Sequence, residues 1–269
     1  MTLRNLLKKL KNDIDPLDAD LIIQHVLKLN KAQIYSNLEK EIDHQDQDLI
    51  NKMFKSRLRG EPLAYLTGHK GFWKNDFLVS KDVLVPRPET EILVEAILEE
   101  NLNDKTILEL GTGSGVISIS IADEVKNCTI YATDISIRSL LIAKKNAKQI
   151  NLDNIIFLNH DWNNEWLFPN VDFIISNPPY IDKKETTGSE EGIWFEPEDA
   201  LFSKKNGLYD IEVILKKSKN ILNKNGKIFI EHAPCQKEEI KKIGSSNKYK
   251  NISNLIDLNG DVRASIFKC

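Results

Sequence analysis

Apolar residues recur at helical spacing through the first quarter of the chain. Asp15-Pro16 is a typical helix start, and apolar positions follow it on one face: Leu17, Leu21, Ile22, Val26 and Leu29. A second helical run covers residues 42–58, and its apolar face contains Leu49, Ile50, Met53, Phe54 and Leu58. Glycine and proline interrupt the pattern after residue 60. We therefore predict a small helical domain over residues 1–75.

The next segment changes from helical to extended character. Residues 77–85, FLVSKDVLV, place two apolar runs around Ser-Lys-Asp, which predicts a β-hairpin. The PRPETE segment that follows is stiffened by Pro86 and Pro88, and a helix is expected from Glu89 to Glu100. We assign residues 76–90 to a hairpin and linker between two domains.

From residue 105 onward, short apolar runs alternate with helical patterns. Strands are predicted at 106–110, 129–134, 155–159, 172–176, 227–232, 253–258 and 263–267, and helices at 115–124, 137–150, 209–222 and 236–243. Such alternation predicts a mostly parallel sheet with helices on both faces. Asn259-Gly260-Asp261 joins the last two strands as a hairpin, which adds one antiparallel strand. The second domain is predicted to cover residues 91–269.

Composition narrows the class of protein. Of 269 residues, 41% are hydrophobic and 29% charged, which is typical of a globular protein, and the net charge of -3 lacks the basic excess of proteins that grip DNA. The three cysteines are widely separated, which argues against a disulfide framework or a zinc site. No stretch approaches the roughly 20 apolar residues of a membrane span. We expect a cytoplasmic protein without a metal ion and without direct nucleic-acid binding.

A glycine-rich loop follows the first strand of the sheet. ELGTGSG (109–115) has the spacing G-x-G-x-G, whereas the dinucleotide fingerprint needs G-x-G-x-x-G. The loop resembles the cofactor loop of class I S-adenosylmethionine-dependent methyltransferases. The alternative is a turn that only packs helix on strand.

Candidate ligand contacts follow the next two strands as well. Asp134 ends the second strand, where an acidic residue accepts ribose hydroxyls, although it could instead cap a helix. Asp161-Trp162 follows the third strand, and in similar methyltransferases residues here hold adenine. Trp162 suits stacking on a base but could also be a core residue.

The fourth strand ends in Asn177-Pro178-Pro179-Tyr180. The Asn177 side-chain oxygen and the Pro178 carbonyl can both accept hydrogen bonds from one NH2 group, and Tyr180 offers a flat face for a planar amide or base. Two such acceptors would orient the nitrogen lone pair toward a methyl donor. NPPY is shared by enzymes that methylate bases and by enzymes that methylate glutamine, so it predicts a planar NH2 substrate without choosing one.

Several further motifs resemble one family along nearly the whole chain. These are GEPLAYLTGHKGFW (60–73), LVPRPETEILVE (84–95), ELGTGSG, SNPPYI, WFEPEDALF (194–202) and NGLYDIEVIL (206–215). In this order they resemble the protein-(glutamine-N5) methyltransferases of the HemK/PrmC type. EHAPCQ (231–236) departs from that family's usual Glu-His-Gly or Glu-Ile-Gly.

The resemblance implies a fold, a reaction and a set of site residues. The fold is a class I, Rossmann-like methyltransferase domain with a seven-stranded sheet, preceded by a helical domain that docks the substrate. The reaction is methyl transfer to the glutamine of the Gly-Gly-Gln motif in class 1 peptide chain release factors, with S-adenosylhomocysteine as product. Cofactor contacts are implied for Gly111, Thr112, Gly113, Ser114, Gly115, Asp134, Trp162 and Asn177. Substrate contacts are implied for Asn177, Pro178, Pro179 and Tyr180.

Other interpretations remain open at this stage. The chain could methylate an exocyclic amine of a nucleic acid, or a ribosomal-protein glutamine, or it could be a binding module that kept a methyltransferase core. Phe195 could cap the substrate pocket or fasten a loop, and Arg87 could pair with Glu89 or Glu91. We expect a monomer, and we expect the loop 181–207 to act as a lid.

Overall fold

The computed structural model describes residues 1–184, 192–257 and 259–268. Packing divides the chain into two compact units. One contains Met1–His69 and a short segment ending at Phe195, and the other contains the rest of the chain from Lys70 onward. The predicted domain limits, 1–75, 76–90 and 91–269, stay a prediction, because compact packing and independent folding are different properties.

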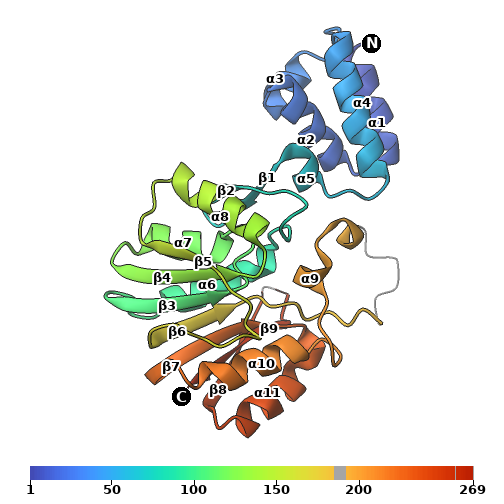
Figure 1. Ribbon diagram of the computed structural model, residues 1–269. Coiled ribbons are helices and arrows are strands. Elements are labelled where there is room, and N and C mark those ends of the chain that lie inside the picture. The colour runs from blue at the N-terminus through green and yellow to red at the C-terminus, as the bar shows by residue number, and fades with distance from the viewer. Residues whose placement is uncertain (185–191, 258, 269) are drawn as a thin grey trace. The chain divides into compact units, whose positions relative to one another are not determined.

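The helical unit is a small bundle with an apolar centre. Its helices are α1 (Leu3–Asp13), α2 (Pro16–Leu27), α3 (Lys31–Ser36), α4 (His44–Leu58) and α5 (Leu63–Thr67) (Figure 1). The predicted helix start is confirmed, since Pro16 is the first residue of α2 and the Asp15 side chain accepts a hydrogen bond from the Leu17 N–H. Leucines of α1 and isoleucines of α2 and α4 meet in one core, which joins the helices.

The sheet unit begins with a two-stranded hairpin, followed by a seven-stranded sheet. The hairpin strands are β1 (His69–Phe72) and β2 (Asn75–Leu78). The large sheet contains β3 (Lys105–Leu110), β4 (Cys128–Asp134), β5 (Ile155–Asn159), β6 (Val171–Ser176), β7 (Leu222–Glu231), β8 (Lys250–Ile256) and β9 (Val262–Lys268). Its main helices are α6 (Glu91–Leu98), α7 (Val116–Glu124), α8 (Ile137–Gln149), α10 (Tyr209–Ser218) and α11 (Lys237–Ser246). Shorter elements are η1 (Pro88–Thr90), η2 (Ile193–Phe195), α9 (Glu198–Leu201) and η3 (Pro234–Gln236).

The strands lie in the order β5-β4-β3-β6-β7-β9-β8 (Figure 1). All pairings from β5 to β7 are parallel, and β9 runs antiparallel to both of its neighbours. The predicted seven-stranded, mostly parallel sheet with one antiparallel strand and a preceding helical part is therefore confirmed.

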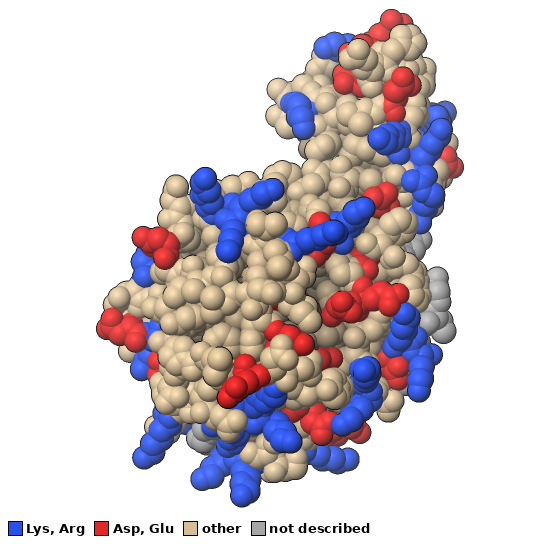
Figure 2. All heavy atoms as spheres, viewed as in Figure 1, with Lys and Arg blue, Asp and Glu red and all other residues tan. Residues whose placement is uncertain are grey.

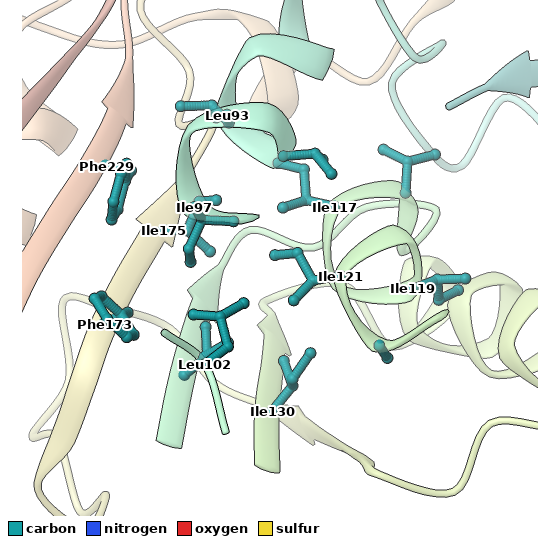
Figure 3. Packing of buried hydrophobic residues seen from close by; sticks show 14 of the residues in the cluster. Leu93, Ile97, Leu102, Ile117, Ile119, Ile121, Ile130, Phe173, Ile175 and Phe229 are labelled. Atoms are coloured by element: carbon teal, nitrogen blue, oxygen red, sulfur yellow. The ribbon is translucent and has the colours of Figure 1, made fainter. Parts of the chain in front are cut away.

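Alternating residues of each strand serve two different cores. Ile107, Phe173 and Phe229 pack with α6 and α7 on one face (Figure 3). Their neighbours in sequence, such as Leu108 and Ile174, pack with α10 and α11 on the other face. Because both faces are covered, the central strands are apolar along nearly their whole length, as expected for parallel strands.

Two sequence predictions about this unit are wrong. The hairpin is not formed by residues 77–85 but earlier, with its turn at Trp73 and Lys74, where Trp73 adopts a φ of +54°. The second apolar run, with Val83 and Val85, is buried without joining a strand. The helix predicted over 209–222 ends at Ser218, because Leu222 already belongs to β7.

The lid predicted for residues 181–207 falls partly outside the described residues. The described section from Glu196 to Ala200 is ordered against the sheet unit, where Glu196 is buried. The lid itself stays a hypothesis.

Candidate active site

The carboxyl ends of four neighbouring strands meet around one cavity. β3, β4, β5 and β6 are adjacent in the sheet, so the residues that follow them lie together, which is where ligands bind in sheets of this kind. The cavity has a volume of about 320 Å³ and belongs to the sheet unit. Eight of the predicted site residues line it: Gly111, Thr112, Gly113, Ser114, Asp134, Trp162, Asn177 and Pro179. Gly115, Pro178 and Tyr180 do not.

The glycine loop needs glycine for two different reasons. Gly111, Gly113 and Gly115 all have positive φ angles, of 76°, 56° and 86°. A Cβ atom at Gly113 would meet nothing within 4 Å, so this position leaves open space beside the loop. A Cβ atom at Gly115 would lie 2.7 Å from Ile119 Cδ1, so this glycine allows α7 to start close to the strand. Gly115 therefore shapes the loop without facing the cavity.

Asp134 is held rigidly at the end of β4. Its two carboxylate oxygens accept backbone hydrogen bonds from Gly113 and Ser136, each at 2.8 Å. Burial raises the pKa of Asp134, and these two hydrogen bonds oppose that shift. The side chain thus joins the glycine loop to the next strand and presents its remaining lone pairs at the cavity.

Trp162 forms one wall of the cavity. Its Nε1 donates a hydrogen bond of 2.9 Å to Asp210 Oδ1 on α10. The ring lies so close to Gly111 that a Cβ atom there would be 3.2 Å from Trp162 Cζ3. Asp161 is not part of the lining, and its carboxylate accepts the Asn163 N–H at 2.8 Å.

The NPPY segment divides its side chains between the cavity and the interior. Asn177 lines the cavity, and its Nδ2 donates a hydrogen bond of 3.0 Å to Thr90 Oγ1. Tyr180 points elsewhere and donates from its hydroxyl to Glu231 Oε1 at 3.1 Å. The Tyr180 backbone carbonyl accepts from Gln236 Nε2 at 2.8 Å, so η3 supports the segment from behind.

A buried carboxyl group that the sequence analysis did not select lies beneath the glycine loop. Glu109 Oε2 accepts hydrogen bonds from the Thr112 and Ser118 hydroxyls, while Oε1 has no partner among the described residues. Burial raises the pKa of Glu109 to about 7. Glu109 also lines the cavity, so an acidic group with one unpartnered oxygen lies next to the space for a ligand. The only sequence signal was an acidic residue inside an otherwise apolar strand.

The linker also contributes to the site in an unexpected way. Arg87 does not pair with Glu89 or Glu91 as predicted. It forms an ion pair with Glu196, which is buried and also accepts the Val85 N–H at 2.9 Å. The two partners are more than 100 residues apart in the sequence, so no local sequence pattern could have predicted the pairing. Phe195 belongs to the compact unit of the helices and does not line the cavity.

The described residues contain neither a cluster suited to a metal ion nor a helix suited to a membrane span. Within the described residues, no group of three or more His, Cys, Asp or Glu side chains is arranged to hold a metal ion. None of the helices described here combines the length and apolar character that crossing a membrane requires.

The strand order, the glycine loop and the residues at the strand ends define a class I methyltransferase. Family models agree with this class: residues 87–193 match the methyltransferase small domain, and residues 2–68 match the PrmC N-terminal domain. A crystal structure of a methyltransferase from Pyrococcus furiosus covers 84% of this chain and 98% of its own, with a TM-score of 0.53. At 20% identity this likeness shows the fold alone.

Curated relatives narrow the class to one family. A release factor glutamine methyltransferase of Buchnera aphidicola subsp. Schizaphis graminum is 38% identical over 97% of this chain and 95% of its own length. One of Francisella tularensis is 38% identical over 92% of this chain and 88% of its own. The chain belongs to the release factor glutamine methyltransferase family.

Proposed function

We propose that this protein transfers a methyl group from S-adenosylmethionine to the side-chain amide nitrogen (N5) of a glutamine in a peptide chain release factor. The glutamine is that of the Gly-Gly-Gln motif in class 1 factors. One observation carries the proposal: the Asn177 amide lies at the cavity beside the glycine loop, with its nitrogen bonded to Thr90. Because the nitrogen is already engaged, the Asn177 oxygen is the atom left to accept from a substrate NH2 group.

The residues around the cavity fit S-adenosylmethionine. The unpartnered Oε1 of Glu109 suits the ammonium group of its methionine part, and Asp134 suits its ribose hydroxyls. Trp162 supplies a flat wall for adenine, and Gly113 leaves open space where the ligand passes the backbone. When bound, the cofactor supplies a methyl group that is already activated on a sulfonium.

The chemical task of the NPPY segment is positioning. An amide nitrogen is a weak nucleophile because its lone pair is delocalised. Acceptance of its two N–H bonds by Asn177 Oδ1 and the Pro178 carbonyl would fix the nitrogen and direct its lone pair at the methyl carbon. As the N–CH3 bond forms and the S–CH3 bond breaks, the nitrogen becomes far more acidic. It then releases one proton to solvent, so no strong base is needed beforehand. The product would be S-adenosylhomocysteine, and no metal takes part in this scheme.

The surroundings of the site favour a protein substrate. The face drawn in Figure 2 carries both basic and acidic side chains, and the basic ones gather mainly at its lower edge and do not form one stripe across it. The family relatives carry release factors in their names. We further propose that the helical unit docks the release factor, and that the protein works as a cytoplasmic monomer.

The test is transfer of labelled methyl from S-adenosylmethionine to a purified class 1 release factor. Two controls run beside it: a release factor with the Gly-Gly-Gln glutamine changed to alanine, and the enzyme variant Asn177→Ala. Label on the wild-type pair, lost with the altered factor and reduced about 100- to 1,000-fold by Asn177→Ala, is the expected result. Label on RNA or DNA, with none on the factor, would overturn the substrate assignment and leave the cofactor site intact.

A further inference from the structure

Thr90 in the linker touches the substrate-binding asparagine directly. It is 3% exposed, and its Oγ1 accepts the Asn177 Nδ2–H at 3.0 Å. Thr90 ends η1 within the PRPETE segment, 87 residues before Asn177 in the chain. No role in the chemistry was predicted for this segment, yet its Thr90 holds the nitrogen end of the Asn177 amide.

Glu231 lies behind the same pair of residues. Ser176 of β6 pairs in register with Ile230 of β7, so Asn177 and Glu231 are the next residues along two adjacent strands. Glu231 is 1% exposed, and its Oε1 accepts the Tyr180 hydroxyl at 3.1 Å. The Thr90 hydroxyl is close enough to favour the ionised carboxyl and lower its pKa, while Oε2 has no partner of standard hydrogen-bond geometry among the described residues.

Each hydroxyl group has only one proton to donate. This limit decides which group donates and which accepts in the hydrogen bonds around Asn177 and Thr90. Thr90 Oγ1 uses a lone pair for the Asn177 N–H, so its proton is free for an acceptor. The carboxylate of Glu231 is an acceptor only, and it lies beside both the Thr90 and the Tyr180 hydroxyls. An ionised Glu231 would draw the Thr90 proton away from Asn177, and this would keep the Asn177 nitrogen on Thr90 and its oxygen toward the cavity.

Resting on the proposed function, we propose that Thr90 and Glu231 are positioning residues for methyl transfer, because together they hold the Asn177 amide with its oxygen toward the substrate NH2 group. Glu231 does not line the cavity, whereas Thr90 does, with its hydroxyl bonded to Asn177. Their contribution appears in the rate of the chemical step and not in cofactor binding, which depends on residues after β3, β4 and β5.

Ionisation of Glu231 gives this arrangement a pH dependence. Burial raises the pKa of Glu231 to about 7, Tyr180 and Thr90 oppose that shift, Glu89 adds to it and Arg263 reduces it. Burial also raises the pKa of Tyr180, so its hydroxyl stays neutral and can donate. The charges of Arg87 and Arg263 act on this pKa in the opposite sense.

His232 follows Glu231 in the sequence, but its ring contacts Ser265 and the Ala233 carbonyl, and burial lowers its pKa. Protonation of Glu231 below pH 7 would add a proton to the network and release the fixed direction of the Thr90 hydroxyl.

Three variants test the proposal at saturating cofactor and release factor. Thr90→Val keeps the shape of the side chain but removes the hydroxyl, Thr90→Ser keeps the hydroxyl, and Glu231→Gln removes the charge. We expect kcat to fall about tenfold in Thr90→Val and in Glu231→Gln, in line with the loss of one buried hydrogen bond, and to recover in Thr90→Ser. Calorimetric affinity for S-adenosylhomocysteine should be unchanged in all three.

The matched control is Ser218→Ala, which removes a fully buried hydroxyl that donates to the Ile214 carbonyl within α10 and does not line the cavity. Its kcat should equal that of the wild type. In the wild type, kcat should rise as the pH passes through about 7, and in Glu231→Gln this rise should be absent.

The outcomes separate this proposal from the proposed function. No label on the release factor with the wild-type enzyme would defeat the proposed function. Normal transfer by the wild type with an unchanged kcat in folded Thr90→Val would overturn the positioning role alone. A fall in kcat that Thr90→Ser does not restore, or equal losses in kcat and cofactor affinity, would also overturn it, since a merely structural defect gives that pattern. If Thr90→Val does not fold, Glu231→Gln decides: an unchanged kcat and pH profile would overturn the proposal.

Discussion

Asp20 in the helical unit and Glu109 and Glu231 in the sheet unit are all buried carboxyl groups, but their surroundings differ. Asp20 forms ion pairs with Lys11 and Lys31, at 2.6 and 3.4 Å. Burial alone would raise the pKa of Asp20, but Lys11, through its hydrogen bond and charge, acts together with hydrogen bonds from Lys31 and Tyr35 to lower it. Glu109 and Glu231 have no ion-pair partner among the described residues, and burial raises the pKa of each to about 7.

This difference separates an acid that stabilises the fold from acids that serve a site. A buried charge that is fully paired contributes to folding, whereas an unpaired one lowers the stability of the empty protein. Both unmatched acids lie at the carboxyl edge of the sheet, one under the glycine loop and one behind NPPY. These two acids lower the stability of the empty protein. In return, Glu109 is left ready for a cationic ligand, and Glu231 accepts the Tyr180 hydroxyl behind NPPY.

Among changes to these buried acids, the largest expected effect comes from removing the charge at Glu109. In Glu109→Gln we expect affinity for S-adenosylmethionine to fall about 10- to 100-fold, because a charge-assisted hydrogen bond to the ligand ammonium contributes about 1.5–3 kcal/mol. Isothermal calorimetry measures the change, with the exposed Glu238→Gln as control. Unchanged affinity would mean that Glu109 is a second structural acid like Asp20.

The pH dependence of cofactor binding gives the next effect in size. Only the ionised Glu109 attracts an ammonium group, and its pKa in the free protein is about 7. Affinity should therefore rise with pH through 7, and at pH 6 it should be about tenfold weaker than at pH 8. Calorimetry at the two pH values, repeated with Glu109→Gln, tests this. If Glu109→Gln shows the same ratio of affinities at pH 8 and pH 6, the pH dependence belongs to another group.

Removal of the Asp20 charge should affect stability and spare the chemistry. Asp20→Asn removes the carboxylate that pairs with Lys11, and we expect the free energy of unfolding at pH 7 to fall by about 1–2 kcal/mol. The loss is smaller than for a fully buried ion pair because Lys11 reaches solvent. Since the Asp20 pKa is lowered in the folded state, its contribution is present above its ordinary pKa and is lost as the pH falls through the folded value. Urea unfolding at pH 7 and pH 3 measures this, and an equal loss at both pH values would contradict it.

The smallest effect is expected at an exposed ion pair of the same unit. Arg4 and Glu39 lie 2.7 Å apart, but 58% and 77% of their side-chain surfaces are exposed. Arg4→Ala should change the free energy of unfolding by no more than about 0.5 kcal/mol. A larger loss of unfolding free energy, measured with urea, would show that an ion pair in this unit stabilises the fold through the short distance alone, whether or not it is buried.

Local patterns predicted most of the fold and part of the site. Strands such as 106–110 and 172–176 are buried on both faces, so their apolar runs are visible without any knowledge of their neighbours. Gly111, Asp134 and Asn177 were predicted from the resemblance of their motifs to methyltransferases, and their position at strand ends, which converge at one edge of a parallel sheet, supported this. Val83 and Val85 misled the prediction, because burial against other segments gives the same alternation as pairing in a strand.

The site residues that were not predicted from the sequence are those whose contacts are with residues far away in the chain. Thr90 matters because it meets Asn177, 87 residues later, and Glu231 because it meets Tyr180, 51 residues earlier. Neither residue is unusual in its own segment. The pKa of Glu109 likewise depends on how completely the sheet and α7 enclose it, which no local pattern states.

The support of Asn177 by Thr90 and Glu231 has a consequence for the order in which the site is completed during synthesis. The ribosome makes the linker first, the glycine loop and NPPY next, and β7 last of these. A nascent chain that ends before β7 contains Gly111, Asp134 and Trp162 but not Glu231. Such a chain holds the residues proposed to bind the cofactor before it can fix the asparagine that orients the substrate.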